Sequence, residues 1–275
     1  FLLEIDRQTS SKALAQLTDE LQQVLSEVEQ VVSDWTPMQD KLDNARTSLS
    51  DIPFAIDPNV QQEAIEFVDW LAKHNFTLMG YRYYKVRPEE GDYIWQPHDE
   101  TSLGIMLNTT RNRDRRISNL PSSARKATLS QHPLILTKTT SVARVHRPTY
   151  LDYVGIKEFN SEGQVVGEHR FLGLYSAALY NSSVINIPVL KQKIAQVCQL
   201  MDVEQGTHAF KATINILETY PREELLHSSS KELARIVKGI LQMQERGFSR
   251  MFTRKDAYGR FISCLVYVPR ERYNT

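Results

Sequence analysis

The sequence predicts an α+β fold in which an antiparallel five-stranded sheet carries helices on one face. Three observations lead to this class. Between residues 76 and 176, runs rich in β-branched and aromatic residues alternate with turn residues, a pattern typical of antiparallel strands. Long helices are predicted before these runs and further helices after them, because apolar residues recur there at every third or fourth position. A last pair of strand-like runs near the end predicts a C-terminal hairpin.

Composition excludes several classes of protein. The chain has 275 residues, of which 41% are hydrophobic and 24% charged, as in ordinary globular proteins. Because 33 basic residues balance 33 acidic ones, we expect no nucleic-acid partner. No apolar run approaches the length of a membrane span, so we expect no membrane partner and a cytoplasmic location. The first residue is Phe1 rather than a methionine, and we expect a piece of a longer protein.

Two cysteines, Cys198 and Cys264, each lie in an apolar run. This setting favours a pair of buried reduced thiols over a disulfide or a metal site.

The first predicted elements are long helices with one narrow apolar seam, the spacing of coiled-coil-like pairing. Pro37 interrupts the seam and predicts either a kink or a restart with Thr36 as the cap. Two interpretations remain open: a helical hairpin packed on its own domain, or an arm that contacts a partner subunit. The seam consists of Leu14, Leu17, Leu21, Val24, Val28, Val31, Trp35, Met38, Leu42, Ala45 and Leu49.

A further helix begins after a turn-rich break, with Asp57 as its cap and Pro58 at its first position. Its last turn holds Lys73 and His74, where positive charge is favoured. The segments that follow are a strand at Phe76–Val86, a shorter strand at Tyr93–Trp95, a short helix at Thr101–Asn108, a loose basic segment at Arg111–Thr128 and a strand at Leu134–Thr139.

A hairpin at residues 149–176 is the clearest signal. Its strands are predicted at Tyr153–Phe159 and Val165–Leu174, joined by a five-residue loop that contains Gly163. Strand alternation places Val154 and Ile156 on one face with Glu158. The opposite face holds Tyr153, Gly155, Lys157 and Phe159.

The order from residue 76 to 176 is strand, strand, short helices and three strands. This order fits a PAS-like sensor fold with five strands, whereas an ACT-like sheet requires regular β-α-β crossovers. After it, Pro188–Met201 predicts a helix, and Phe210–Tyr220 fits either a strand or a helix. A capping box begins the next helix at Ser229, and Gly247 ends it. The final hairpin is predicted at Ser249–Arg254 and Arg260–Val268.

Signals for catalysis are absent from the sequence. It contains no nucleotide-binding glycine motif, no zinc-protease motif and no nucleophile elbow. No two of the seven histidines stand three or four positions apart, so we expect no local metal site. His169 is expected to be packed or exposed rather than a catalytic base. We therefore expect no catalytic, cofactor-binding or metal-binding residue in this chain.

Three residues are candidates for binding a small ligand. Arg144, His146 and Arg147 precede the central hairpin, and guanidinium groups bind a carboxylate through two hydrogen bonds. The alternative is a solvated loop, which we also expect for the basic run from Arg111 to Lys126.

Three segments resemble one enzyme family. They are VHRPTYLDYVGIKEFNSEGQVVGEHRFLGLYS (145–176), ILETYPREEL (216–225) and RKDAYGRFISCLVYVPRERYNT (254–275). Together they resemble the N-terminal regulatory region of the large bacterial NAD-specific glutamate dehydrogenases, from about Asp51 onward. The resemblance favours a helix at Phe210–Tyr220 and implies four parts. These are the end of an ACT-like module, with its last strand at Phe1–Ile5, together with the seam helices (1–50), a PAS-like sensor domain (52–185), connecting helices (186–247) and the first hairpin of a second ACT-like module (248–275).

The same resemblance implies a function. The parent enzyme would oxidise L-glutamate to 2-oxoglutarate and ammonia with NAD, whereas the family's nicotinamide-binding glycines and catalytic lysine have no counterpart here. We expect a regulatory and assembly region that senses a small metabolite, with an amino acid as effector, in a homo-oligomer. The partner would be the rest of the parent chain with its catalytic domain. The alternative is a purely structural oligomerisation module without a ligand.

Overall fold

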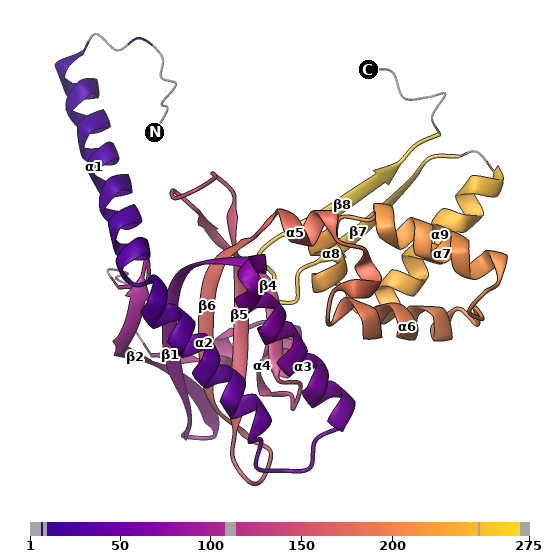
Figure 1. The fold of residues 1–275 in the computed structure, drawn as a ribbon, viewed down its shortest axis with the longest axis horizontal. Helices are drawn as coiled ribbons and strands as arrows, with labels where there is room; N and C mark the ends of the chain where they lie inside the picture. The colour runs from indigo at the N-terminus through magenta and orange to yellow at the C-terminus, as the bar shows by residue number, and fades with distance from the viewer. Residues whose placement is uncertain (1–6, 8–9, 108–113, 247, 270–275) are drawn as a thin grey trace.

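The structure is a computed structural model that describes residues 7, 10–107, 114–246 and 248–269. A curled antiparallel sheet carries helices, and beside it lies a helical unit with a two-stranded hairpin (Figure 1). The predicted α+β class is therefore confirmed. The predicted strand at Phe1–Ile5 and the helix stop at Gly247 lie outside the described residues.

The apolar seam forms two helices, α1 (Ser11–Ser33) and α2 (Trp35–Ser50). They are separated at Asp34, so the expected interruption at Pro37 is wrong. Pro37 lies in the first turn of α2, where a backbone N–H would have no partner within the helix. The carboxylate of Asp34 accepts a hydrogen bond from the backbone N–H of Gly104 at 2.6 Å, which ties the break to the sheet.

The two halves of the seam bury different amounts of surface. α2 places four seam residues in the core, whereas only Val31 is buried on α1. α1 projects away from the sheet and does not fold back on α2 (Figure 1). The helical-hairpin interpretation is therefore wrong, and the arm that contacts a partner subunit stays a prediction.

The main sheet has six strands rather than the predicted five. All neighbouring pairs are antiparallel. The additional strand is β3, whose two residues pair with Ile94 and Trp95 and are too few to show a strand pattern in the sequence. In spatial order the strands are β3 (Arg115–Arg116), β2 (Asp92–Gly104), β1 (Phe76–Glu89), β6 (Val165–Tyr175), β5 (Tyr150–Phe159) and β4 (Leu134–Val142).

β2 is also longer than predicted. The sequence predicts a short helix at Thr101–Asn108, but β2 continues to Gly104 because Leu103 and Gly104 pair with Tyr81 and Gly80 of β1. Pairing with the neighbouring strand β1 here overrides the local preference of these residues for a helix. Asn108 lies outside the described residues.

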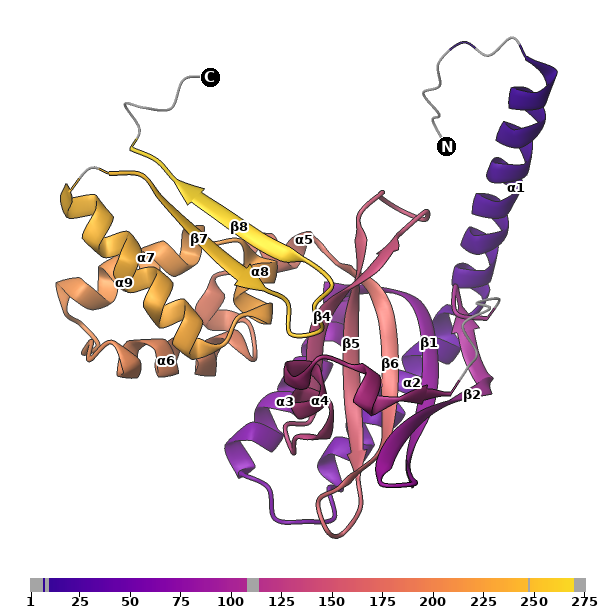
Figure 2. The same cartoon turned by 180° about the vertical axis from the view of Figure 1, so that it is seen from behind.

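Helices are not confined to one face of the sheet. α2 and α3 (Pro58–Trp70) cover one face, and α4 (Ser122–Leu129) lies against the other (Figures 1 and 2). The reason is Lys157, which points to the second face and donates from Nζ to the carbonyl oxygens of Ala127 at 2.5 Å and Ser130 at 2.9 Å. These bonds satisfy carbonyl groups at the end of α4. The segment predicted as loose thus holds β3, the 3₁₀ turn Ile117–Asn119 and α4.

The start of α3 follows the prediction. Asp57 accepts a hydrogen bond from the backbone N–H of Asn59 at 2.9 Å, and Pro58 occupies the first helical position. α3 continues into a π-helical turn, η1 (Leu71–Asn75), in which His74 has a left-handed backbone with φ of 61°. The side chain of Asn75 donates to the carbonyl oxygen of Trp70 at 2.7 Å and closes the turn.

The helical unit follows the sheet. The capping box at its last helix is confirmed, since the backbone N–H of Glu232 donates to Ser229 Oγ and that of Ser229 to the Glu232 carboxylate. The ambiguous segment 210–220 is a helix. The elements are α5 (Ala177–Asn181), the 3₁₀ turn η3 (Val184–Asn186), α6 (Leu190–Leu200), α7 (His208–Thr219), α8 (Arg222–His227), α9 (Ser230–Arg246), β7 (Arg250–Lys255) and β8 (Ile262–Tyr267).

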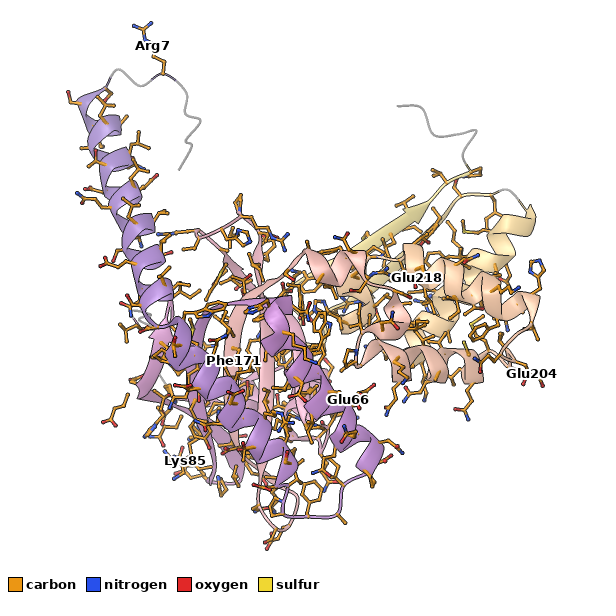
Figure 3. All side chains as sticks on the ribbon, in the orientation of Figure 1. Arg7, Glu66, Lys85, Phe171, Glu204 and Glu218 are labelled. Atoms are coloured by element: carbon orange, nitrogen blue, oxygen red, sulfur yellow. The ribbon has the colours of Figure 1, made fainter. Side chains whose placement is uncertain are left out.

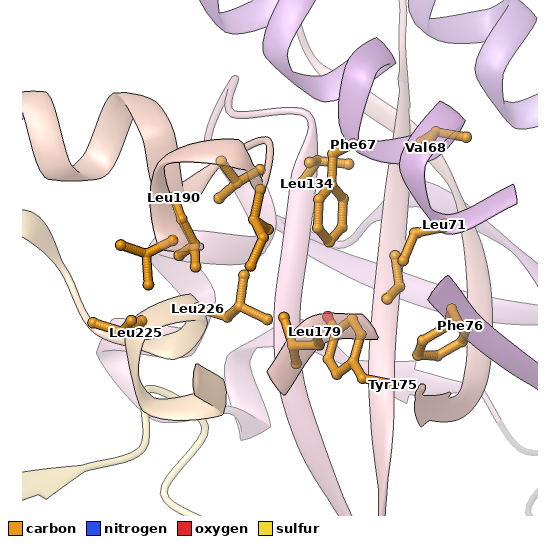
Figure 4. Packing of buried hydrophobic residues seen from close by; sticks show 14 of the residues in the cluster. Phe67, Val68, Leu71, Phe76, Leu134, Tyr175, Leu179, Leu190, Leu225 and Leu226 are labelled. Carbon is orange, nitrogen blue, oxygen red and sulfur yellow. The ribbon is translucent and has the colours of Figure 1, made fainter. Parts of the chain in front are cut away.

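The sheet and the helical unit share one apolar core. Leu134 and Phe67 from the sheet side meet Leu179 and Leu226 of the helical unit (Figure 4). Side chains fill this junction, whereas Glu204 lies at the far end of the helical unit (Figure 3). Continuous burial of this kind holds the two parts together as one hydrophobic cluster.

The cysteines differ from the expectation. Cys198 is buried, as predicted, but Cys264 is exposed, because it lies on the outward face of β8. Within the described residues, none of the helices is both long enough and apolar enough to cross a membrane.

Candidate functional site

The three expected ligand residues lie in the loop between β4 and β5, and they face different partners. Arg144 is exposed, and its guanidinium lies 3.6 Å from the carboxylate of Glu27 on α1. His146 is exposed and has a left-handed backbone with φ of 74°. Arg147 turns toward the end of β6, where its Nη2 donates to the carbonyl oxygen of Tyr175 at 3.0 Å. The loop therefore does not form a closed clamp.

Arg147 nevertheless keeps an unused donor. Its guanidinium lies 5.9 Å from the ring centre of Tyr180, a cation–π arrangement. Its Nε atom is buried and has no hydrogen-bond partner among the described residues. Since a buried donor without a partner is costly, this atom is a polar group that the described residues leave unsatisfied.

Beside this loop, a lysine joins the sheet to the helical unit. Lys138 Nζ on β4 lies 2.9 Å from Asp152 on β5 and 2.9 Å from Glu223 on α8. Tyr180 donates to the second carboxylate oxygen of Glu223 at 2.6 Å. We call Lys138, Asp152 and Glu223 the junction cluster. Together with Tyr180 of α5, it connects two strands with two helices through charge-assisted hydrogen bonds.

Asp152 is the most unusual member of the junction cluster electrostatically. Burial raises its pKa to about 6, although the neighbouring Lys138 acts in the opposite direction. The residue has no exposed surface. A carboxyl group with this pKa changes its charge just below neutral pH, so the junction contains a group that responds to pH.

The turn of the second hairpin also contacts the sheet. Asp256 accepts a hydrogen bond from Thr137 on β4 at 3.1 Å. Arg260 donates to the carbonyl oxygen of Lys138 at 2.5 Å, and Ser123 of α4 donates to that of Ala257 at 2.6 Å. The hairpin is thus attached to β4 and α4 by its turn.

The same hairpin is attached to the helical unit. Arg254 on β7 holds both carboxylate oxygens of Glu224 on α8, at 2.8 and 2.9 Å. Glu223 and Glu224 are neighbours, so α8 contacts the junction cluster on one side and the hairpin on the other. The sheet, the helical unit and the hairpin therefore meet around α8.

Two further polar clusters lie on the sheet, and both are filled by the chain's own side chains. On the face that carries α4, the guanidinium of Arg170 lies 3.7 Å from the ring centre of Tyr84 and 4.9 Å from that of Tyr153. Glu168 pairs with Arg170 at 3.3 Å and also accepts a hydrogen bond from Tyr153. This aromatic cage already contains a cation, which indicates a structural role.

His169 lies in the second cluster, beneath α2. Its Nε2 is 2.8 Å from Glu158, and its Nδ1 is 2.9 Å from the hydroxyl of Tyr81. The hydrogen bond with His169 lowers the pKa of Glu158 to about 2. Tyr83 and Ser48 also donate to this carboxylate, at 2.6 and 3.2 Å. As the sequence predicts, His169 is packed, and Glu158 lies on the face opposite Lys157.

Among the residues that the structure describes, no group of three histidine, cysteine, aspartate or glutamate side chains is placed to hold a metal ion. The junction cluster is the feature that sequence reasoning missed. Its one local signal is Asp152, a charged residue inside the apolar strand TYLDYVGIKEF.

Comparisons with known proteins match two parts of this chain to family models. The family model described as "Glutamate dehydrogenase, helical motif 1" matches residues 187–246, and "Glutamate dehydrogenase, ACT2 domain" matches residues 250–275. The first covers α6 to α9 and the second includes the β7–β8 hairpin. The hairpin attached around α8 is thus part of a segment similar to an ACT2 domain.

Three curated relatives carry the same name, NAD-specific glutamate dehydrogenase. Those of Halomonas elongata and Pseudomonas aeruginosa are 36% and 34% identical over 99% of this chain. That of Mycobacterium tuberculosis is 26% identical over 96% of it. The chain spans only 17%, 17% and 15% of these relatives. The resemblance that the sequence indicates is confirmed, and it concerns one region of much longer proteins.

Proposed function

Because this chain corresponds to a segment of the large NAD-specific glutamate dehydrogenases, we propose that it forms a non-catalytic regulatory and assembly region of such an enzyme. The whole protein would convert L-glutamate, NAD and water into 2-oxoglutarate, ammonia and NADH in the cytoplasm. NAD and the catalytic residues would belong to the rest of the parent chain, which is the first partner of this region.

The observation that carries the proposal is the attachment of the ACT2-similar hairpin at two places. Asp256 and Arg260 attach its turn to β4, and Arg254 attaches its first strand to Glu224. A movement of the β4–β5 loop would therefore move the hairpin as well, because the hairpin is attached to both β4 and α8. Packed side chains and hydrogen bonds of this kind can carry coupling between a sensing loop and a distant domain.

The proposed effector is an amino acid, bound at the loop of Arg144, His146 and Arg147. The unused Nε donor of Arg147 supports this site, since a carboxylate oxygen would satisfy it. The loop adjoins the junction cluster, because Arg147 and Glu223 both contact Tyr180. The PAS-like domain at 52–185 would then sense the effector, and the helices at 186–247 would connect it to the ACT-like module.

Calorimetry with a panel of amino acids tests the proposal. We expect heat from at least one of them with the 275-residue chain, and a weaker affinity in Arg147→Ala and Arg144→Ala. Arg115→Ala, an exposed arginine outside the loop, is the matched control and should bind as the original chain does. Equal heats of binding in all four proteins would show that the loop is not the binding site.

A second candidate is a purely structural role in a homo-oligomer. It is favoured by the exposed apolar stripe on α1, where Leu14 and Leu25 are 47% and 52% exposed. A stripe of this kind on a projecting helix is typical of a surface that pairs with another helix. Sedimentation of the chain and of Leu14→Glu/Leu21→Glu separates the two roles. Self-association that the variant abolishes, together with no heat from any amino acid, would favour the structural role.

A further inference from the structure

A cavity of about 280 Å³ opens between α2 and the segment that leads from η1 into β1. Its floor is apolar. The residues that form this floor are Leu42, Leu71, Phe76 and Leu78, each no more than 3% exposed. Its size is near the lower end of the range for small-molecule pockets, so it would admit a small ligand.

The rim of the cavity is polar and acidic. Trp35, Gln39 and Asp43 follow one another at four-residue intervals on α2 and share a face of that helix. Asp40 lies beside them, and His74 closes the rim from η1. One helix face thus supplies an aromatic ring, an amide and a carboxylate to the same opening, with a second carboxylate next to it.

The two carboxylates are not neutralised by the chain itself. In the described part of the structure, neither the Asp40 nor the Asp43 carboxylate forms an ion pair or accepts a side-chain hydrogen bond, and the Thr47 hydroxyl donates to the backbone carbonyl oxygen of Asp43 instead. α2 carries two cations: Lys41, which follows Asp40 directly and forms no ion pair with either carboxylate among the described residues, and Arg46, whose guanidinium is bound to Asp69 of α3. Asp40 and Asp43 therefore keep their capacity to hold a positive charge at the mouth of an apolar cavity.

We propose that this cavity binds a small organic cation with an aliphatic body. The positive group would lie between Asp40 and Asp43, where charge-assisted hydrogen bonds form, and beside the ring of Trp35, since tryptophan is the best aromatic partner for a cation. The aliphatic body would lie on the Leu42 and Phe76 floor, where it leaves water. A hydrated metal ion does not fit this description, because an apolar floor offers it no oxygen ligands.

This site is separate from the loop of Arg144, His146 and Arg147, whose guanidinium groups suit an anion instead. The inference therefore does not rest on the proposed function, and each is tested by its own ligand. Occupation of the cavity would join α2, the end of α3 and β1 at one point.

The test uses n-pentylammonium chloride as the probe, with n-pentanol and sodium pentanoate as neutral and anionic probes of the same length. Binding is followed by the indole N–H resonance of Trp35, which is assigned by its absence in Trp35→Phe. We expect saturable shifts with the ammonium probe and markedly weaker ones with the other two. Asp40→Asn and Asp43→Asn should each weaken binding by about tenfold, the usual effect of losing one charged hydrogen-bond partner.

Asp19→Asn, an exposed carboxylate on α1, is the matched control and should leave the affinity unchanged. Because Asp40 and Asp43 are also exposed, their variants should melt at the original temperature, and a thermal scan checks this. Equal shifts with pentanol or pentanoate would overturn the proposal. So would an Asp40→Asn/Asp43→Asn variant that binds pentylammonium as tightly as the original chain.

Discussion

Arg254 of β7 binds Glu224 of α8 through two hydrogen bonds, from Nε and Nη2 to the two carboxylate oxygens. The side chains are only 5% and 15% exposed, so water screens the pair weakly. Desolvation alone would lower the pKa of Arg254, but the bonds to Glu224 prevail and raise it. The hairpin that matches the ACT2 family model is therefore attached to the helical unit by a buried ion pair, in addition to the packing of Phe252 in the apolar core.

Replacing one member of this pair should destabilise the fold. Glu224→Gln leaves the Arg254 charge buried without its partner, and we expect the free energy of unfolding to fall by about 3 kcal/mol. Urea unfolding followed by circular dichroism measures this change. Glu204→Gln, at the exposed end of the helical unit, should change stability by less than about 0.5 kcal/mol.

The double variant Glu224→Gln/Arg254→Met separates the ion pair from other contacts. With no charge left to bury, it should recover a large part of the lost stability. A double variant as unstable as Glu224→Gln alone would contradict the assignment of the cost to the unpaired Arg254.

The junction cluster should make stability depend on pH in an unusual direction. Burial raises the pKa of Asp152 from 3.8 to about 6, so the folded state holds this proton more tightly than the unfolded state. Its contribution to the free energy of unfolding is therefore favourable below about pH 4 and falls by roughly 3 kcal/mol as the pH rises through 6. Urea unfolding at a series of pH values should show this fall.

Asp152→Asn should remove that pH dependence, although it also weakens the contact with Lys138 and lowers stability at every pH. The decisive measurement is thus the change in the free energy of unfolding with pH between about pH 4 and 6, rather than its absolute value. An unchanged slope in Asp152→Asn would exclude Asp152 as its source. Asp19→Asn, which is exposed, should keep the original slope.

Glu158 should act in the opposite direction. Its pKa is lowered to about 2, first by the hydrogen bond with His169. It therefore contributes stability that is present above about pH 4.5 and is lost as the pH falls through 2. His169→Phe should raise the pKa of the Glu158 carboxyl, as measured by carbon NMR, and Ser48→Ala should raise it less because the hydroxyl bond is weaker at 3.2 Å. Equal pKa values for Glu158 in the two variants would refute the larger effect assigned to His169.

Local patterns predicted the central hairpin well. Residues 153–159 alternate between faces as the sequence indicates: Val154 and Ile156 are buried beneath the helices, and Lys157 binds α4 on the other face. Cap signals were equally informative, at Asp57 and at Ser229. These features depend on neighbours in the sequence, which is why residues alone were sufficient to predict them.

Features that depend on distant partners could not be predicted. β3 exists because Arg115 and Arg116 pair with β2, and the break before α2 is held by a hydrogen bond between Asp34 and Gly104. The junction cluster is a similar case, because Lys138 and Glu223 meet only after the helical unit packs on the sheet. The candidate loop was predicted as three convergent side chains, but Arg144 pairs with α1 and Arg147 faces Tyr175.

The contact between β1 and β6 gives the last prediction. A methyl group on Gly173 would overlap the backbone carbonyl oxygen of Thr77, which the sheet holds in place, whereas one on Gly167 of the same strand would meet the movable hydroxyl of Tyr83. We expect Gly173→Ala to lower the free energy of unfolding by about 3 kcal/mol or more, and Gly167→Ala by roughly 1–2 kcal/mol. Urea unfolding of both variants measures the difference. If Gly173→Ala proves the milder substitution, the close approach of β1 to β6 at Thr77 is wrong.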